Sequence, residues 1–587
     1  MNHSQDLKRL LESIDHKGYP AYKAVQGSYD FKDYILTVDH VQGDPFASPS
    51  KVSVFIPHKI NAFPEGYYDR QWKKTALEDY LLRCFSQEIA RFNFKAKGSG
   101  KGGLIATSRP GQEVLTRSAC ECTGTGITAR FEVGFPAFGR TINSGELIKI
   151  LFDFLPGCVR NVFMYKNRNP KQVRDVIELA EDQEFIRNEL KRLDLVSFAA
   201  DGSVLPRETG ISDRPMKGSV PFSSPESLKI TLNLPHHGPL CGMAVRRGIT
   251  LIVGGGYHGK STLLKALEAG VYNHIAGDGR EYVITDSTAV KLRAEDGRSI
   301  SNVDISLFIN DLPNKKDTRC FSTEDASGST SQAAAVIEGI EAGSRVFLID
   351  EDTSATNFMV RDDLMQKIIS RAQEPITPFI ERARDLYEKS GISTVMVAGS
   401  SGAYFYIADT ILQMDCYEPL DITDKTKTFC SAYGVEPITS APGFLLPSGE
   451  RRLISNKVGS QAVSGNFAAA NRGNYRGRGT LGGGRDERIK VKVYGKDSLQ
   501  IGKSPVDLRF VEQLIDAEQT STLAQMLRYC VEHQLLERYT VRDTVSMLLK
   551  EIQKGGLAAV GDSSYTACGL SMPRIQEIYA CINRYRN

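Results

Sequence analysis

The sequence contains a glycine-rich segment with the residue spacing of a phosphate-binding loop. Gly254, Gly259, Lys260 and Ser261 satisfy the pattern G-x-x-x-x-G-K-[ST], with Gly255, Gly256, Tyr257 and His258 between the glycines and Thr262 after the serine. In such a loop the backbone amides surround phosphate oxygens and the lysine ammonium binds them. An apolar run at 249–253 precedes the loop, and leucines at helical spacing follow it. This order of strand, loop and helix predicts a nucleotide-binding site.

A second segment ends in acids that would complete the chemistry. Arg345 is followed by a short apolar run at 346–349, which leads directly into Asp350 and Glu351. Hydrolysis of a nucleotide requires Mg²⁺ and a group that positions the attacking water. We therefore expect Asp350 beside the metal ion and Glu351 closer to the γ-phosphate. The alternative is a buried strand followed by a solvated acidic turn.

Two further motifs resemble those of ATP-binding-cassette (ABC) ATPases. Residues 350–357 are similar to the second acidic motif and its adjoining turn, and residues 326–332 are similar to the Ser-Gly-Gly-Gln signature. The order of these motifs along the chain and the spacing between them also agree with those of ABC ATPases. More closely, residues 255–261, 275–281, 325–333 and 350–358 resemble the soluble ATPases of the ABC class, a family that includes an RNA-binding protein of trypanosome mitochondria. The resemblance extends from residues 40–46 to residues 583–586.

This resemblance implies a role for each matching residue. Lys260 and the amides of residues 255–262 would hold the β- and γ-phosphates of ATP, and Ser261 and Asp350 would hold Mg²⁺. Glu351 would polarise the attacking water. Ser327, Gly328 and Ser329 would offer hydroxyls and helix-terminal amides to the γ-phosphate of a partner chain. One loop and one signature per chain then imply a head-to-tail homodimer that encloses two ATP molecules.

Three departures from the family pattern concern the speed of turnover. The segment 397–401 lacks the switch histidine of ABC ATPases. The usual glutamine after the phosphate loop has no clear counterpart, and Asp304 is the substitute that we assign as a metal ligand. Asp352 stands where a proline usually follows the catalytic glutamate. The sequence indicates no aromatic side chain that would stack on adenine.

Two stretches combine positive charge with residues that suit nucleic acids. Residues 451–503 carry 12 Lys or Arg against 3 Asp or Glu, although the whole chain has a net charge of only +3. Within them, Arg472, Arg476 and Arg478 alternate with glycines around a tyrosine, a pattern that favours RNA. The second stretch has Lys95, Lys97 and Lys101 after Phe92 and Phe94. The alternatives are a flexible linker for the first and a hairpin turn with core phenylalanines for the second.

The remaining patterns predict an α/β protein with several domains. Strand candidates at 34–41, 51–56 and 126–133 and helix candidates at 73–91 and 171–195 indicate an N-terminal α+β domain, residues 1–200. An ABC-type P-loop ATPase domain follows at 201–440, in which residues 200–245 should be an extended connection because they are rich in Pro, Gly and Ser. We expect a basic loop and a strand at 441–503 and a helical domain at 504–587.

Composition limits the classes of function. Charged residues make up 24% of the chain and aromatic residues 9%, as in soluble globular proteins. No apolar stretch reaches the roughly 18 residues of a membrane span, and the scattered cysteines favour reduced thiols. We expect an ATP hydrolase in the cytoplasm, with the mitochondrion as the alternative. Its partner should be RNA, with single- or double-stranded DNA as alternatives. An ATPase that acts on a protein partner, or an ATP-gated interaction module, remains open.

Overall fold

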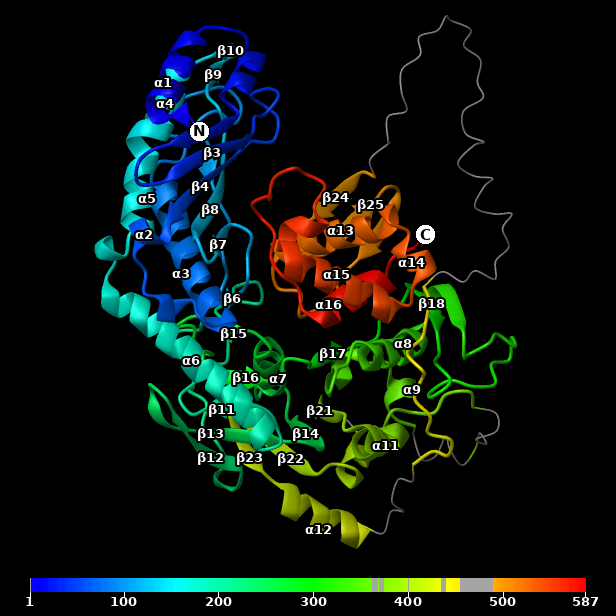
Figure 1. Cartoon of the computed structure of the whole chain (residues 1–587). Helices are drawn as coiled ribbons and strands as arrows, with labels where there is room; N and C mark the ends of the chain where they lie inside the picture. The colour runs from blue at the N-terminus through cyan, green and yellow to red at the C-terminus, as the bar shows by residue number, and fades with distance from the viewer. Residues whose placement is uncertain are drawn as a thin grey trace, which may run out of the picture.

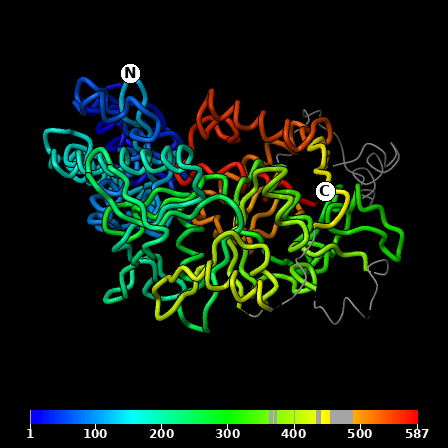
Figure 2. The backbone as a smooth tube through the Cα atoms, turned by 90° about the horizontal axis from the view of Figure 1, so that it is seen from below, coloured from blue at the N-terminus to red at the C-terminus, as the bar shows by residue number. Residues whose placement is uncertain are grey.

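The computed structural model describes residues 2–361, 368, 374–399, 401–433, 440–453 and 489–586. Figure 1 shows an N-terminal part in blue and cyan, a central part in green and yellow, and a C-terminal part in orange and red. The C-terminal part lies beside both others in Figure 1 and in Figure 2, and it forms hydrogen bonds with each of them. None of the helices in the described residues combines the length and apolar character of a membrane span. All 11 cysteines are free.

The N-terminal part is a mixed sheet covered by helices. Its strands run in the order β1-β2-β3-β4-β8-β5, with β7 beside β8. Their bounds are β1 Asn2–His3, β2 Gly27–Asp30, β3 Ile35–His40, β4 Ser50–Pro57, β5 Ile105–Ala106, β7 Cys120–Cys122 and β8 Gly126–Val133. Alternate residues of β4 are buried, because successive side chains of a strand point to opposite faces. The strands predicted at 34–41, 51–56 and 126–133 are confirmed.

The helices over this sheet are α1 Ser4–Ser13, α3 Gln71–Ala90 and α5 Leu155–Phe163, joined by the short α2 His58–Asn61 and α4 Ser144–Ile148. Leu7, Leu81 and Val159 of these helices share one core with Val54 of β4. The long α6 Pro170–Arg192 then leads from this part to the centre (Figure 1). Asn169 caps α6 by accepting a hydrogen bond from the Lys171 amide at 3.0 Å. The helices predicted at 73–91 and 171–195 are confirmed.

A small antiparallel sheet begins the central part. Its order is β12-β13-β11-β16, with bounds β11 Leu195–Ala200, β12 Lys229–Leu234, β13 Gly238–Arg246 and β16 Val283–Thr285. The prediction of an extended connection over 200–245 is therefore wrong for its second half, where β12 and β13 form a hairpin. The proline and glycine near residue 235 belong to the hairpin turn, where Gly238 has a φ of +80°.

The main sheet of the central part is almost entirely parallel. Its order is β17-β20-β21-β14-β22-β23, and only β23 is antiparallel to its neighbour. The bounds are β14 Ile249–Gly254, β17 Val290–Leu292, β20 Val346–Asp350, β21 Ser393–Val397, β22 Thr410–Asp415 and β23 Glu418–Asp421. All five residues of β20 are buried, as expected for a parallel strand between two helical layers. The flanking helices include α7 Lys260–Ala269, α8 Gly328–Glu341 and α11 Ile380–Ser390.

Shorter elements complete the centre. The hairpin of β18 Arg298–Val303 and β19 Phe321–Ala326 leads directly into α8, and α9 Thr356–Met359 follows the acidic end of β20. The strands β6 Glu113–Val114 and β15 Asn273–His274 pair across the boundary of the N-terminal and central parts. The hairpin of β9 Ala137–Phe138 and β10 Thr141–Ile142 stays in the N-terminal part, and α12 Thr423–Tyr433 follows β23.

The C-terminal part packs helices on a small antiparallel sheet. The strands are β24 Val491–Tyr494, β25 Ser498–Ile501 and β26 Ser504–Asp507, and the helices are α13 Ala517–Glu532, α14 Leu535–Arg538, α15 Val541–Gly555 and α16 Ile575–Asn583. The predicted C-terminal helices are confirmed, and Ser504–Asp507 belongs to the sheet that they cover. Leu499 and Val506 of the strands share one core with Leu527 of α13.

Arg117 joins the N-terminal and C-terminal parts. Its guanidinium is 2% exposed and donates to Asp516 Oδ2 and Glu518 Oε2, both at 2.6 Å. Asp516 also caps α13. Because both carboxylates lie more than 390 residues away in the sequence, this ion pair network fixes the tertiary arrangement of the two parts.

We expect the substitution Arg117→Met to lower the free energy of unfolding by about 2–4 kcal/mol, because it leaves two partly buried carboxylates without their cation. Urea unfolding followed by the fluorescence of Trp72, the single tryptophan, measures this change. The matched control is Arg509→Met, which removes an exposed ion pair with Asp507 and should cost less than about 1 kcal/mol. Equal effects of the two substitutions would show that the buried network contributes no specific stability.

Candidate functional site

The phosphate-binding loop joins the end of β14 to the start of α7. Gly254 and Gly259 have φ angles of +139° and +97°, in the region that favours glycine. A Cβ atom on Gly254 would collide with the carbonyl oxygen of Met414 on the neighbouring β22. The loop therefore needs these glycines both for its backbone conformation and for its close approach to β22. The first amides of α7 remain available at the loop, as an anion site requires.

Lys260 and His258 hold the loop in its present conformation. Lys260 Nζ donates to the carbonyl oxygens of Gly254 and Gly255, both at 2.8 Å. To reach a phosphate, the ammonium must exchange these carbonyl oxygens for phosphate oxygens. His258 Nδ1 accepts a hydrogen bond from the Cys416 amide at 2.9 Å, which ties the loop to the turn between β22 and β23.

The acidic strand end lies at the same edge of the sheet. Ile252 of β14 and Asp350 of β20 are both paired with Val397 of β21, so the two outer strands are about 10 Å apart. Because the carboxyl ends of parallel strands meet at one edge, Asp350 and Glu351 face the region of the phosphate loop. Asp350 is 6% exposed. Its backbone carbonyl accepts a hydrogen bond from the Ser354 hydroxyl at 2.9 Å, which orders the turn after the strand.

A backbone amide contacts the predicted catalytic carboxylate. The Gly399 amide, two residues after the end of β21, donates to Glu351 Oε2 at 2.6 Å. This is the segment in which the sequence lacks the switch histidine. The structure therefore gives the loop after β21 a contact with Glu351 that needs no imidazole. Residue type could not reveal it, because every residue except proline carries a backbone N–H.

The signature segment caps the helix α8. The Ser327 hydroxyl accepts a hydrogen bond from the Thr330 amide at 3.4 Å and lies 2.9 Å from the Thr330 hydroxyl. Gln332, fully buried, donates to the Ser354 hydroxyl at 3.0 Å and accepts from the Ala355 amide at 2.9 Å. The signature helix is thus bonded to the turn that follows Asp350 and Glu351.

A cavity of about 820 Å³ opens beside the phosphate loop. Its polar wall contains Lys260, Ser261, Thr262 and Asp352, together with the loop residues Gly256, Tyr257 and Gly259. The rest of the lining is largely apolar and includes Leu205, Pro206, Met216, Val220, Phe222, Met414 and Tyr417, which we call the apolar wall. Its size and mixed walls suit a nucleotide, with phosphates at the polar end and the base at the apolar end.

Sequence reasoning missed the apolar wall. The sequence predicted an extended connection around Met216 and Val220, but both residues line the cavity and are 40% and 45% exposed. Phe222, Tyr257 and Tyr417 line this cavity with aromatic side chains, which the sequence did not indicate. Asp304 does not line the cavity; its carboxylate accepts hydrogen bonds from the amide and hydroxyl of Ser306 in its own turn. Ser327, Gly328 and Ser329 do not line the cavity of their own chain either.

The three predicted lysines lie on an exposed face with aromatic side chains. Lys95, Lys97 and Lys101 are exposed, and Phe94 beside them is 47% exposed. The Lys101 amide donates to the Pro45 carbonyl at 2.8 Å and the Ser99 amide donates to the Ala137 carbonyl at 2.7 Å. These bonds bring Phe46 and Phe138, which are 64% and 66% exposed, next to the lysines. We call Lys95, Lys97, Lys101, Phe46, Phe94 and Phe138 the lysine face.

Phe92 and the three predicted arginines are not part of the lysine face. Phe92 stacks on Phe154 with ring centres 4.7 Å apart, and the Lys95 ammonium lies 4.9 Å from the centre of the Phe92 ring. Phe92 is thus part of the support of the lysine face, as the alternative of a core phenylalanine predicted. Arg472, Arg476 and Arg478 lie outside the described residues, and their assignment stays a prediction.

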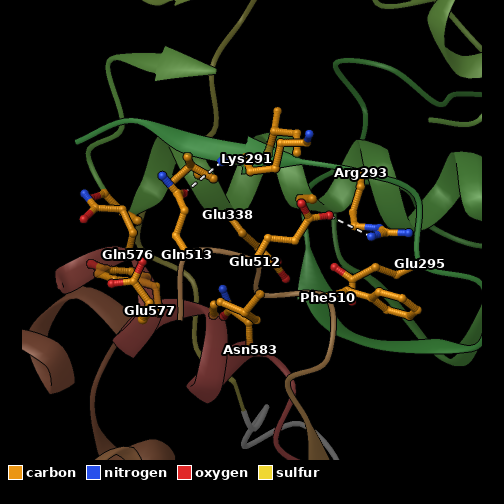
Figure 3. Close-up of a pocket in the computed structure, with 18 of the residues that line it drawn as sticks. Lys291, Arg293, Glu295, Glu338, Phe510, Glu512, Gln513, Gln576, Glu577 and Asn583 are labelled. Carbon is orange, nitrogen blue, oxygen red and sulfur yellow. Dashed lines mark hydrogen bonds and ion pairs between the residues drawn. The ribbon is translucent and has the colours of Figure 1, made fainter. Parts of the chain in front are cut away.

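The C-terminal part holds the far end of the phosphate-loop helix. Gln513 accepts a hydrogen bond from the Lys291 amide at 3.0 Å and donates to the Glu268 carbonyl at 3.2 Å, near the end of α7. Glu512 pairs with Arg293 at 2.7 Å. Figure 3 shows this ion pair and the hydrogen bond between Lys291 and Gln513 at a junction of charged side chains. This junction encloses only about 60 Å³, too small for a nucleotide. It is therefore a structural link from the C-terminal part to α7.

Fold and site together define a P-loop nucleotide-binding protein. A strand lies between the phosphate-loop strand and the strand with the acidic end, and a signature helix is bonded to the acidic turn. Comparison with protein families matches residues 4–166 to "ATPase of the ABC class N-terminal", residues 169–443 to a "P-loop domain" of ABC ATPases, and residues 490–587 to the "MRB1590 C-terminal domain". The chain belongs to the ATPases of the ABC class.

Individual relatives cover parts of the chain. The uncharacterized protein MJ1628 of Methanocaldococcus jannaschii is 31% identical over 229 residues, which are 38% of this chain and 50% of that protein. The chain thus matches about half the length of this relative. Among solved structures, cbiO1 of Clostridium perfringens, part of the ABC transporter complex cbiONQ, is 12% identical, with 40% of this chain and 92% of that chain covered and a TM-score of 0.24. The ADP conformation of MJ1267, an ATP-binding cassette of an ABC transporter, is 13% identical, with 33% and 88% covered and a TM-score of 0.23.

Proposed function

We propose that this protein binds ATP with Mg²⁺ between two copies of the chain, hydrolyses it, and couples the closure of the dimer to RNA binding. The observation that carries this proposal is the cavity at the phosphate loop, with Lys260, Ser261 and Asp352 in one wall. The buried Asp350 lies at the same edge of the sheet. Cation, hydroxyl and carboxylates are the groups that nucleotide hydrolysis requires.

Different residues bind the phosphates, bind Mg²⁺ and activate the attacking water. Lys260 and the amides at the start of α7 bind the β- and γ-phosphates. The hydroxyl of Ser261 and the carboxylates of Asp350 and Asp352 are hard oxygen donors, which fit Mg²⁺. When bound, Mg²⁺ neutralises charge that develops on the phosphate oxygens. Glu351 accepts a proton from the attacking water, and the Gly399 amide orients its carboxylate.

Two copies of the chain are needed because each chain's signature lies apart from its own cavity. Ser327 is exposed at the start of α8, where the helix offers amide donors to an anion. In a head-to-tail dimer, Ser327, Gly328 and Ser329 of one copy contact the γ-phosphate bound by the other. ATP then favours the closed dimer, since each nucleotide contacts both chains, and hydrolysis removes that contact.

The lysine face supports RNA as the partner. Positive side chains bind the phosphate backbone, and exposed aromatic rings stack on unpaired bases of any sequence. Three phenylalanines that are 47–66% exposed around three lysines are costly in water without a partner. Arg472, Arg476 and Arg478 would add further cations.

We expect the triple substitution Lys95→Ala, Lys97→Ala and Lys101→Ala to weaken RNA binding and to lower the slope of log affinity against log salt by about 2. The double substitution Phe46→Ala and Phe138→Ala should weaken binding about 10-fold or more with the salt slope unchanged. Fluorescence anisotropy with single-stranded RNA at several salt concentrations measures both. The control replaces the exposed Lys425 and Lys427 of α12 with alanine. RNA affinity equal to that of the control would exclude the lysine face.

An ATPase that acts on a protein partner is the second candidate, because the exposed phenylalanines also suit a protein surface. Phosphate release measured with ATP alone, and then with added single- and double-stranded RNA and DNA, tests the proposal. Stimulation of turnover by RNA is the expected result. ATP turnover without any effect or binding of nucleic acid would favour the protein partner, and ATP binding without turnover would favour an ATP-gated interaction module.

A further inference from the structure

A histidine, an aspartate and a cysteine meet where the phosphate loop contacts the main sheet. His258 Nδ1 lies 3.2 Å from Asp415 Oδ1, and the Cys416 backbone amide donates to the same nitrogen at 2.9 Å. In the described part of the chain, these three side chains form the group whose possible metal ligands, including Cys416 Sγ, all lie within 4.8 Å of one another. Neither the phosphate chemistry nor the Mg²⁺ site described above uses these side chains.

We propose that His258, Asp415 and Cys416 form a binding site for Zn²⁺ or a similar transition-metal cation, which fastens the phosphate loop to the turn between β22 and β23. Imidazole nitrogen, thiolate sulfur and carboxylate oxygen are the ligands that Zn²⁺ takes in proteins, whereas Mg²⁺ is bound by oxygen. Tetrahedral Zn²⁺ separates two nitrogen or oxygen ligands by about 3.4 Å, close to the 3.2 Å between His258 Nδ1 and Asp415 Oδ1.

Binding of the ion would replace one hydrogen bond and release one proton. On binding, the ion takes the nitrogen lone pair that now accepts the Cys416 amide, and the thiol proton passes to solvent as the metal–sulfur bond forms. Asp415 and Cys416 are exposed, so the ion can enter from solvent and keep a water molecule as its fourth ligand.

The turn that carries two of the ligands has an unfavourable backbone. β22 and β23 pair up to Asp415 and Glu418, which leaves Cys416 and Tyr417 as a two-residue hairpin loop. Both have positive φ angles, +47° and +75°. Such turns strongly prefer asparagine or glycine, and neither is present. Strained backbone of this kind is concentrated at functional sites.

An ion here would act on the nucleotide site, a consequence that rests on the proposed function. Gly259 lies against Tyr417, which also lines the nucleotide cavity. A metal bridge from His258 to Cys416 would stabilise the present loop, in which Lys260 bonds the loop's own carbonyl oxygens. ATP must compete with that conformation. Zn²⁺ should therefore lower ATP affinity, and ATP should lower Zn²⁺ affinity by the same factor.

Titration of the full chain with Co²⁺, in the absence of nucleotide, tests the site by its absorption spectrum. We expect one Co²⁺ per chain with a thiolate charge-transfer band, present in the wild type and in Cys320→Ser, which alters another exposed cysteine. The band should vanish in Cys416→Ser, and Co²⁺ affinity should fall about 10-fold or more in Asp415→Asn. A band that survives Cys416→Ser, or no thiolate band in the wild type, would overturn the proposal.

The effect on ATP is measured separately, with a fluorescent ATP analogue and Mg²⁺ at fixed concentration. Zn²⁺ should weaken analogue binding about fivefold or more in the wild type and should have no effect in Cys416→Ser, which also controls for chelation of Zn²⁺ by the nucleotide. A normal Co²⁺ spectrum with unchanged ATP affinity would refute the regulatory effect and leave the metal site standing. A chain that binds Co²⁺ but never the analogue would instead refute the proposed function.

Discussion

Replacing Glu351 with glutamine is expected to lower ATP turnover about 100- to 10,000-fold, the range in which a positioned general base contributes. Glutamine has the same shape and can still accept the hydrogen bond from the Gly399 amide, so the loop after β21 keeps its contact. It cannot accept a proton from water. ATP should therefore remain bound, and the closed dimer should accumulate because the step that removes the γ-phosphate is blocked.

Phosphate release and ATP retention after gel filtration measure the two halves of this result. Glu388→Gln, which alters an exposed carboxylate on α11, is the matched control and should behave as the wild type does. If Glu351→Gln releases phosphate at the wild-type rate, Glu351 is not the base. The ATP-gated interaction module then becomes the better description.

Two inactive variants are expected to regain activity when they are mixed. Lys260→Ala removes the cation of the phosphate loop, and Ser327→Arg places a bulky side chain at the signature. Ser327 is exposed, so the second change should cost only about 1 kcal/mol of helix capping. In a head-to-tail dimer of one copy of each, the intact loop of the Ser327→Arg chain meets the intact signature of the Lys260→Ala chain. One of the two composite sites is then complete.

Each variant alone should release phosphate at the background rate. An equimolar mixture should reach about a quarter of wild-type activity, since random pairing makes half of the dimers mixed and each has one complete site. A mixture of Lys260→Ala with Glu351→Gln is the control. Both changes affect the same half of the site, so that mixture should stay inactive. If the first mixture also stays inactive while each variant dimerises, the site is completed within one chain.

The contacts within one chain explain how such a dimer could transmit its closure. Gln332 bonds the signature helix to the turn after Glu351, and Gln513 bonds the far end of α7 to the C-terminal part. Arg117 then links the C-terminal part to the N-terminal part, which carries the lysine face. These contacts connect the helix after the phosphate loop, through the C-terminal part, to the N-terminal part.

Local patterns in the sequence predicted the phosphate loop, the acidic strand end and the long helices. The glycines and Lys260 predict the phosphate loop, because a loop wrapped around phosphate needs glycine at fixed spacings and an adjacent cation. The apolar run before Asp350 predicts a buried strand with acids at its end. The period of apolar residues predicts α3 and α6 in the same way. These patterns depend only on neighbours along the chain, so the sequence alone predicts the helices and strands. Their alternation then indicates the α/β fold class.

The prediction of an extended connection over 200–245 was wrong in its second half because it rested on composition alone. Pro, Gly and Ser mark breaks in regular structure, but they do not say whether a break is a linker or a hairpin turn. The alternation of apolar residues in Lys229–Leu234 was the signal for β12, and the composition of the longer window concealed it.

By itself, the sequence determined the local structure of the phosphate loop and of the acidic strand end, where a few neighbouring residues fix the conformation. Only the tertiary structure decided what surrounds them: the apolar wall of the cavity, the Gly399 amide at Glu351, Phe46 and Phe138 beside the lysines, and Cys416 beside His258. The physical reason is that each of these pairs joins residues far apart in the chain. Their contact depends on how strands pair and layers pack, which no short stretch of sequence specifies.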